Sequence, residues 1–443
     1  MAYLKKIGFA AVLGLFVQMA TGQIIQPVLQ LKDYVKSSTP AGYSPRLGKL
    51  TLTPKGNLHY LFPLYHALKD SAKFIKIYSE KGYYDELSQY YAFAGDYQTA
   101  LQCLEKSYDS IDDAGRRKIY KMAEGSKELQ HVDARRYISF AARSNRVVMI
   151  NEHWSKPLHR AFTISLLSDL YRQGYHYLAM EMLNNFSDGN LTGVNLHTGY
   201  YTAEPVAGEL VRTALAIGYK LIAYEDTAAA THTVDERDSI QALNLYKVIQ
   251  ADTGAKILVH AAFAHISKKK GPDGYTPMGL YFKKMSGIDP LTIDQTDMTE
   301  ESNFGFGRVW YQAYQQRYPV RTPSIALLNN EAVNVTNNDL FDLIVIHPPT
   351  LYQYGRPVWL SLGGMRKPFY IKPPMSNTFL VQAYYQDEYS HNSDKPWQLV
   401  PADQTYVPGG KNNYMLYLKP GKYEILFRDI DYHILRNLNI EVN

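Results

Sequence analysis

Short apolar runs alternate with helical patterns through the middle of this chain, and each run ends on an ionisable residue. The runs RVVMIN, YHYLAM, KLIAY and KILVHAAFA end on Glu152, Glu181, the pair Glu225-Asp226 and His265. Runs rich in Val, Ile, Leu and Tyr are typical of buried strands in a parallel sheet. The carboxyl ends of neighbouring strands in such a sheet open onto a common crevice. We therefore expect these carboxylates and the imidazole to meet in one site, suited to acid/base chemistry or to a cation.

The same periodicity predicts the order of the elements in this section. Strands are expected at 146–152, 175–181, 219–225, 255–262 and 341–347, with an extended piece at 288–294. Helices are expected over His159–Gln173, around Ala207–Ile217, over 235–251 and near Gly279–Met285. Strand–helix alternation at this spacing implies right-handed crossovers, and hence a mainly parallel α/β sheet with helices on both faces.

The flanking sections follow other patterns. From about Leu58 to Ala142 the pattern is helical, and YYAFAGDYQTALQCLEKSY is similar to one tetratricopeptide-like hairpin that turns at Gly95-Asp96. Since only one clear copy is present, we expect a small helical domain rather than an array. After about residue 352, apolar and polar residues alternate in segments that are separated by turn sequences. This pattern predicts a small antiparallel, sandwich-like β domain. The expected domains are 23–145 (lead-in and helical), 146–351 (α/β) and 352–443 (β).

The N-terminus has the pattern of a signal peptide. Lys5 and Lys6 precede the apolar run 7–17, and Ala20 and Gly22 suit a cleavage point before Gln23. The alternative is a membrane anchor, but the run is short for a span. We expect residues 1–22 to be removed and the protein to be exported, to the periplasm or outside the cell. No later apolar stretch is long enough to suggest a transmembrane segment.

Composition excludes some classes of function. Hydrophobic residues make up 46% and charged residues 20% of the 443 residues, which is ordinary for a globular protein. The net charge of +5 is spread over the whole length, so nucleic-acid binding is not expected. Cys103 is the only cysteine, so export implies no internal disulfide. The phosphate-binding loop, the Cys-x-x-Cys pair, the His-Glu-x-x-His helix and the Gly-x-Ser-x-Gly elbow are all absent from the sequence.

Each candidate residue also has a plain structural interpretation. Glu152 could cap the helix that follows it, because carboxylates stabilise helix N-termini. His265 could be a satisfied buried histidine, although its place at a strand end favours a crevice. Arg237 lies near a predicted helix start, where a cation is unfavourable, so a carboxylate or anionic ligand partner is expected. Glu225 and Asp226 could belong to the site or to a solvated loop.

The middle section resembles the erythromycin esterase-like branch of a superfamily that also contains the Tiki proteases and the haem-uptake lipoproteins. The resemblance covers roughly residues 146–350 in the family's order. It rests on the segments VVMINEHWSKPLHR, YHYLAME, RDSIQALN, AKILVHAAFAHISK, PMGLYFKKMSG and FDLIVIHPPT. Asn151 stands where the family has Gly, Ser155 where the esterase-like pattern has His, and Trp154 where the haem-uptake pattern has His.

The resemblance implies roles for five residues. Glu152, Glu181, Arg237 and His265 carry over as catalytic residues, with Glu152 and His265 also as ligands of a divalent metal. His159 carries over as a cofactor-binding residue, an axial ligand if the cofactor is haem. The function implied is an exported hydrolase, acting with or without a metal on an ester, lactone or peptide. The alternatives are a haem- or metal-binding uptake protein and a non-catalytic envelope protein.

Overall fold

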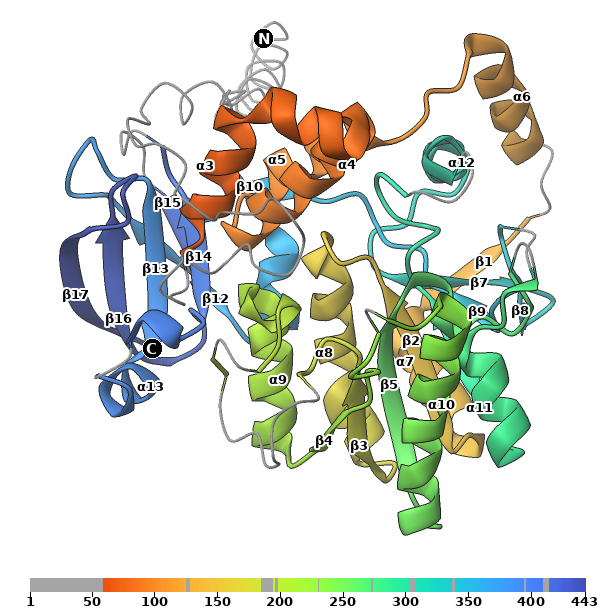
Figure 1. Cartoon of the computed structure of the whole chain (residues 1–443). Coiled ribbons are helices and arrows are strands. Elements are labelled where there is room, and N and C mark those ends of the chain that lie inside the picture. The colour runs from red at the N-terminus through yellow and green to blue at the C-terminus, as the bar shows by residue number, and fades with distance from the viewer. Residues whose placement is uncertain are drawn as a thin grey trace, which may run out of the picture.

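The computed structural model describes residues 59–124, 128–184, 194–195, 198–229, 231–271, 274–302, 307–336, 339–393, 396–408 and 414–443. The expected signal peptide and most of the polar lead-in lie outside these residues, so export stays a prediction. Figure 1 shows an α/β part, a helical part above it and an antiparallel β part beside it. The predicted fold class is therefore confirmed: a mainly parallel sheet with helices on both faces, between a helical region and antiparallel strands.

The central sheet has six strands in the order β4-β3-β5-β2-β6-β9, and every pairing in it is parallel. Its strands are β2 (Val147–Glu152), β3 (Tyr175–Met180), β4 (Lys220–Ala223), β5 (Lys256–Ala262), β6 (Leu291–Asp294) and β9 (Leu343–Ile344). All six form where strands or extended chain were predicted. The last is shorter than the expected 341–347, because Ile346 leaves the sheet to bridge Ser324.

Helices cover both faces of this sheet (Figure 1). The helices on the faces are α8 (Pro157–Tyr171), α9 (Pro205–Ile217), α10 (Val234–Ala251) and α11 (Met278–Ser286), with single 3-10 turns η2 (Tyr201–Ala203) and η3 (Phe263–Ile266). The helix α12 (Gly307–Arg317) lies higher in Figure 1, at the level of the helical part. The side chains of Val148 and Ile150 share an apolar core with α8 and α9. Those of Val147 and Met149 share a second core with α10 and α11. Alternate residues of each strand therefore face different helices.

Most of the helical part lies above the carboxyl edge of the sheet (Figure 1). It contains α3 (Leu61–Lys69), α4 (Ser71–Phe93), α5 (Tyr97–Ser107), α6 (Asp113–Glu124) and, closer to the sheet, α7 (Ala134–Ala141) with η1 (Ala142–Ser144). The predicted hairpin forms between α4 and α5, where Asp96 caps α5 by accepting a hydrogen bond from the Thr99 amide. Gly95 has φ +82°, and a Cβ there would collide with the carbonyl of Gln404, so the turn requires glycine.

A small antiparallel sheet was not predicted. It pairs β1 (Gln130–Asp133), β7 (Ser324–Leu328) and β8 (Glu331–Ala332) in the order β1-β7-β8. The strand β1 lies within the stretch expected to be helical. Its partner β7 is almost two hundred residues away in sequence, so local periodicity gave no signal for the pairing. This sheet ties the end of the helical section to the α/β section.

The C-terminal part is antiparallel, with short helical segments. Its elements are β10 (Tyr352–Gln353), β11 (Arg356–Pro357), η5 (Val358–Gly364), β12 (Lys367–Ile371), β13 (Leu380–Tyr385), α13 (Gln386–His391), η6 (Pro396–Gln398), β14 (Asp403–Tyr406), β15 (Tyr414–Leu418), β16 (Gly421–Arg428) and β17 (Ile434–Val442). A four-stranded sheet, β14-β13-β16-β17, and the pair β12-β15 share one apolar core. The helix α13 was not expected from the sequence.

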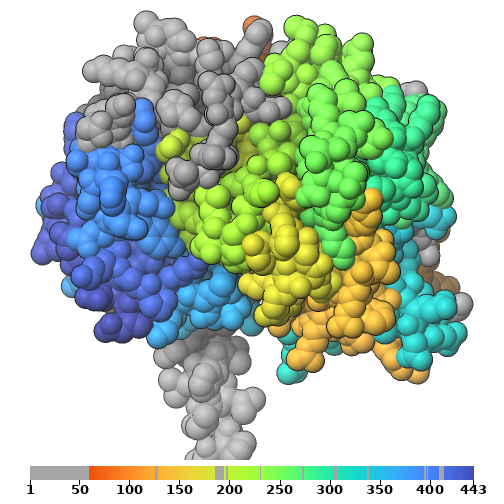
Figure 2. Space-filling view, turned by 90° about the horizontal axis from the view of Figure 1, so that it is seen from below, coloured from red at the N-terminus to blue at the C-terminus, as the bar shows by residue number. Residues whose placement is uncertain are grey.

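The C-terminal part packs against α9, and Figure 2 shows the two surfaces adjoining on the side seen from below. Two ion pairs lie at this junction: the half-buried pair of Arg212 of α9 with Glu388, at 2.7 Å, and the buried pair of Glu209 of α9 with Arg366, at 3.0 Å. No helix in the described ranges combines the length and the apolar character required to cross a membrane.

Candidate active site

The alternation of side chains along the strands separates two residues that were expected to meet. Glu152 ends β2 and stands on the same face of the strand as Val148 and Ile150, which face α8 and α9. Glu181 follows Met180, which also faces α8 and α9, so Glu181 turns toward the opposite face. Because successive side chains of a strand point to opposite faces, the two carboxylates leave the sheet toward different helices.

Glu181 forms the centre of a cluster with Arg237 on α10. One carboxylate oxygen of Glu181 lies 2.6 Å from Nη2 of Arg237, and the other accepts a hydrogen bond of 2.7 Å from the Ala262 amide at the end of β5. Arg237 also donates to both carboxylate oxygens of Glu225, which follows β4, with its Nε at 2.9 Å. Arg237 therefore has two carboxylate partners, Glu181 and Glu225.

His265 joins this cluster and lies against a second carboxylate. Its Nδ1 lies 2.7 Å from Oδ1 of Asp238, which is fully buried on α10. Asp238 Oδ2 accepts hydrogen bonds from the Met278 amide, at 2.8 Å, and from the Tyr275 hydroxyl. The other imidazole nitrogen, Nε2, faces Glu181 at 3.8 Å and Arg237 at 3.4 Å. The side chains of His265 and Glu181 are each 14% exposed, so solvent can reach them.

Charges in the cluster shift the protonation of both groups. Burial alone would lower the pKa of His265, but the carboxylates of Glu181 and Asp238 more than offset this and raise it. Burial alone would raise the pKa of Glu181, but the charges of His265 and Arg237 lower it. Glu181 is therefore ionised at neutral pH, and His265 holds its proton to a higher pH than an ordinary histidine.

Replacing Glu181 by Gln is expected to lower the pKa of His265, because the replacement removes the nearest negative charge on the Nε2 side. An NMR titration of the histidine ring signals measures this directly. Glu225→Gln is the matched control, since it removes an equal charge from the same arginine. An unchanged midpoint in Glu181→Gln, or an equal fall in the control, would show that Glu181 does not act on this imidazole.

Glu152 belongs to a neighbouring buried network. Arg160 of α8 donates to both of its carboxylate oxygens, at 2.7 and 3.1 Å, and to Glu204 at 3.1 Å. The Tyr97 hydroxyl donates to Glu204 at 2.9 Å, and His260 lies 3.9 Å from Glu152. The structure joins Glu181, Arg237 and His265 by direct contacts and pairs Glu152 with Arg160, while both carboxylates act electrostatically on the buried His260. A pocket shared by Glu152, Glu181 and His265 stays a prediction.

His159 lies on α8 and is completely buried. Its Nδ1 accepts a hydrogen bond of 2.9 Å from the His153 amide, and its ring lies 5.6 Å from that of His347. Burial, together with the neighbouring His347 and Lys156, lowers the pKa of His159 well below its ordinary value, so the ring is neutral. A haem iron could reach this ring only if the surrounding chain opened.

The cluster around His265 does not fit a metal ion. The guanidinium of Arg237 lies against both Glu181 and Nε2 of His265, where a cation bound by those two groups would have to sit. Among the described residues, the one group of three or more potential ligands within 4.8 Å of one another is Asp429, Asp431 and His433, in the turn between β16 and β17. The predicted metal pair of Glu152 and His265 is not part of such a group, and we derive no catalytic step through a metal.

Two contributors to the cluster were not singled out from the sequence. Asp238 directly follows Arg237 in the segment RDSIQALN, so the acidic position next to the arginine was an available signal. Tyr275 comes from a loop, and only the tertiary structure brings it to Asp238. Arg160 follows Glu152 by eight residues, but its pairing depends on how α8 packs against the sheet.

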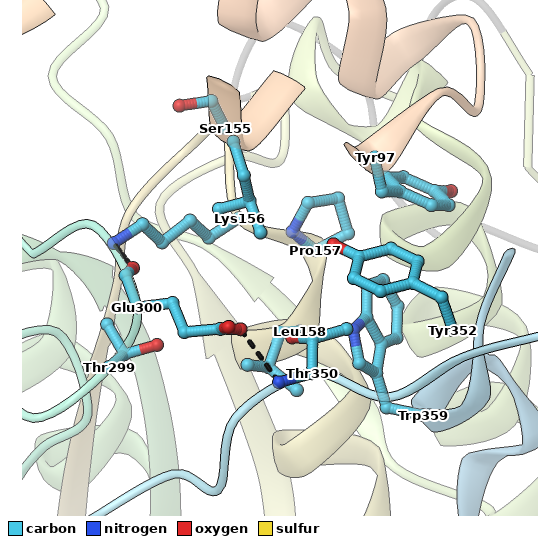
Figure 3. Close-up of a pocket in the computed structure, with 11 residues that line it drawn as sticks. Tyr97, Ser155, Lys156, Pro157, Leu158, Thr299, Glu300, Thr350, Tyr352 and Trp359 are labelled. Carbon is cyan, nitrogen blue, oxygen red and sulfur yellow. Dashed lines mark hydrogen bonds between the residues drawn. The ribbon is translucent and has the colours of Figure 1, made fainter. Parts of the chain in front are cut away.

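A cleft beside the N-terminus of α8 lies outside this cluster (Figure 3). Tyr97, Tyr352 and Trp359 form its aromatic side, while Lys156 donates to the Glu300 carbonyl at 2.7 Å and Glu300 accepts from the Thr350 amide at 2.9 Å (Figure 3). The space inside is about 20 Å³, which suits a single water rather than a ligand. Its walls come from α5, the start of α8 and the chain near residues 300 and 350.

Comparisons with known proteins leave the family open. No family model and no curated protein matches the chain. A solved chain described as "Bacterial protein toxins" aligns with 49% of this chain at 16% identity and a TM-score of 0.28. The alignment spans 47% of that chain, which is less than half of it. A likeness at this level carries no argument about fold or function.

Proposed function

We propose that this protein is a hydrolase of the erythromycin esterase-like type that acts on a small ester. The observation that carries the proposal is the pair of Asp238 and His265, with Nδ1 and Oδ1 2.7 Å apart, facing Glu181 and Arg237 at the carboxyl edge of the sheet. A partly exposed imidazole that is oriented by a buried carboxylate is the arrangement required of a general base. The resemblance of residues 146–350 to that branch supports the same class.

The chemistry follows from the contacts. His265 Nε2 takes a proton from a water that is bound on the exposed side of the cluster and donates its other hydrogen to Glu181, and the resulting hydroxide attacks the ester carbonyl carbon. Arg237 stabilises the negative charge that develops on the carbonyl oxygen. The protonated His265 then returns the proton to the leaving alkoxide as the C–O bond breaks. Asp238 holds the ring orientation and stabilises its charged form.

Hydrolysis of 4-nitrophenyl acetate by the purified protein tests the proposal. We expect turnover above the rate in buffer, and about ten- to a hundredfold lower kcat/KM in Glu181→Gln, because the variant loses the group that positions the water. Glu225→Gln, which keeps the contact between Glu181 and His265, is expected to lose less.

Haemin titration of the same preparation checks the alternative from the same superfamily. A Soret band that disappears in His159→Ala, without ester turnover, would contradict the hydrolase and favour the uptake protein. If neither ester turnover nor a Soret band is found, the non-catalytic envelope protein is the remaining alternative.

A further inference from the structure

The strand β17 forms one edge of the C-terminal sheet. In the order β14-β13-β16-β17 it pairs antiparallel with β16, and among the described residues no strand lies on its other side. Figure 1 shows it on the outer flank of the C-terminal part, away from α10 and hence from the His265 cluster. The outward backbone amides and carbonyls of an edge strand are donors and acceptors that can pair with a strand of another chain.

The sequence of β17 lacks features that usually protect an exposed edge. Its nine residues, ILRNLNIEV, contain no proline, no glycine and no lysine. A register shift lies at its start, between Phe427 and Arg428 of β16. From Arg436 to Val442 the pairing with β16 is regular, so this stretch of seven residues presents an uninterrupted edge.

The face of this stretch that points toward the core of the C-terminal part is mainly apolar. Leu438, Ile440 and Val442 pack against that core, and each of them stays partly exposed. Because side chains alternate along a strand, Asn437 and Asn439 stand on the other face. The core therefore ends at the edge with a row of half-covered apolar side chains, which one more strand would cover.

The edge is also complementary to itself. Two copies of the stretch can pair antiparallel about a twofold axis through its central residue, Asn439, which keeps opposite side chains on the same face of the joined sheet. Each Leu438 then lies opposite Ile440 of the second copy. Four apolar side chains meet at the centre of the core face in this register, and cross-strand pairs of this kind stabilise a sheet.

The polar residues of the stretch do not oppose this pairing. In the same register Arg436 lies opposite Val442 and Glu441 lies opposite Asn437, so no side chain faces a like charge across the axis. The side chains of Asn437 and Asn439 already bond to neighbours within their own chain. The pairing therefore rests on the backbone groups and on the apolar contacts.

We propose that β17 pairs with β17 of a second copy of this chain, which joins the two C-terminal sheets into one continuous sheet. A second copy fits this edge because a single register suits both strands, and twofold dimers are the commonest closed assemblies. The interface is small, so we expect a dissociation constant of about 1–100 µM. The dimer does not depend on the proposed hydrolysis, because no residue of β17 has a role in that reaction.

Sedimentation velocity of the purified full-length protein at about 1 to 200 µM tests the proposal, and we expect a shift from monomer to dimer over this range. Asn439→Lys should weaken the dimer by about tenfold or more, because it places two ammonium groups directly opposite each other. Asn437→Lys is the matched control. It adds the same charge on the same face but opposite Glu441, so its dimer should be no weaker than that of the native protein.

A mixture of two variants guards against a folding defect. Asn439→Glu alone should weaken the dimer as Asn439→Lys does, but an equimolar mixture of both should recover dimers, because opposite charges then meet at the axis. The proposal is overturned if the native protein stays monomeric up to about 200 µM. It is also overturned if Asn439→Lys dimerises as the native protein does, if Asn437→Lys weakens the dimer equally, or if the mixture recovers no dimer.

Discussion

Replacing Arg160 by Met is expected to lower the free energy of unfolding by about 3–5 kcal/mol, because it leaves two buried carboxylates without their cation. Arg160 and Glu204 are fully buried, and the side chain of Glu152 is 6% exposed. Removing a charge from water is costly, and the guanidinium offsets that cost by binding both acids. Methionine has a similar length but supplies no positive charge or hydrogen-bond donor.

Urea denaturation followed by circular dichroism measures this loss. Arg172→Met is the matched control: its guanidinium is 74% exposed and pairs with Asp169, so a change of no more than about 1 kcal/mol is expected. The triple variant Glu152→Gln, Arg160→Met, Glu204→Gln should recover much of the loss, because it removes the uncompensated charges. Equal effects of Arg160→Met and Arg172→Met would show that the buried network contributes no more than a surface pair.

Replacing Asp238 by Asn is expected to lower kcat/KM for ester hydrolysis by about 10²- to 10⁴-fold, the range that general acid–base catalysis contributes. Asparagine keeps the shape of the side chain, but it loses the charge that orients His265 and stabilises its protonated form. Asp235→Asn is the matched control on the same helix. Asp235 binds the Thr276 amide at 2.7 Å and the Tyr281 hydroxyl, and makes no such contact with His265. A loss in Asp235→Asn as large as in Asp238→Asn would assign the effect to the loop around Tyr275 instead of the imidazole.

The pH dependence gives a second readout for Asp238→Asn. A base must be unprotonated, so activity is expected to rise as pH passes the pKa of His265, which lies above its ordinary value of 6.5. Without the Asp238 charge that pKa falls, and the rise in activity should move to lower pH. A merely structural defect would reduce the rate without moving the profile.

The free energy of unfolding should also depend on the protonation of His265. Because folding raises the pKa of His265, the protonated ring stabilises the native state fully below pH 6.5, and this contribution is lost as pH rises through the folded pKa. The pH-dependent part of the difference between the native protein and Asp238→Asn should therefore be largest below pH 6.5 and shrink above it. Unfolding curves at several pH values measure this.

Local pattern was enough to predict the central architecture. Apolar runs at 146–152, 175–181 and 255–262 became β2, β3 and β5, because side chains buried on both faces of a parallel sheet leave a continuous apolar signal. The helices between them were also predictable, because the residues that they bury recur with the helical period. The pairing of β1 with β7 was not, since it joins segments far apart in the chain.

For the candidate site, the apolar runs alone predicted which ionisable residues stand at the ends of strands, because a buried run must stop where a charged side chain can reach a partner or solvent. Tertiary structure decided which of them meet. The two acids stand at positions whose side chains leave the sheet on opposite faces. Glu152 therefore contacts Arg160 on α8, and Glu181 contacts Arg237 and His265, because alternate side chains of a strand face different helices. Only the packing of α10 and its neighbouring loop adds Asp238 and Tyr275, whose contacts with His265 no local pattern encodes.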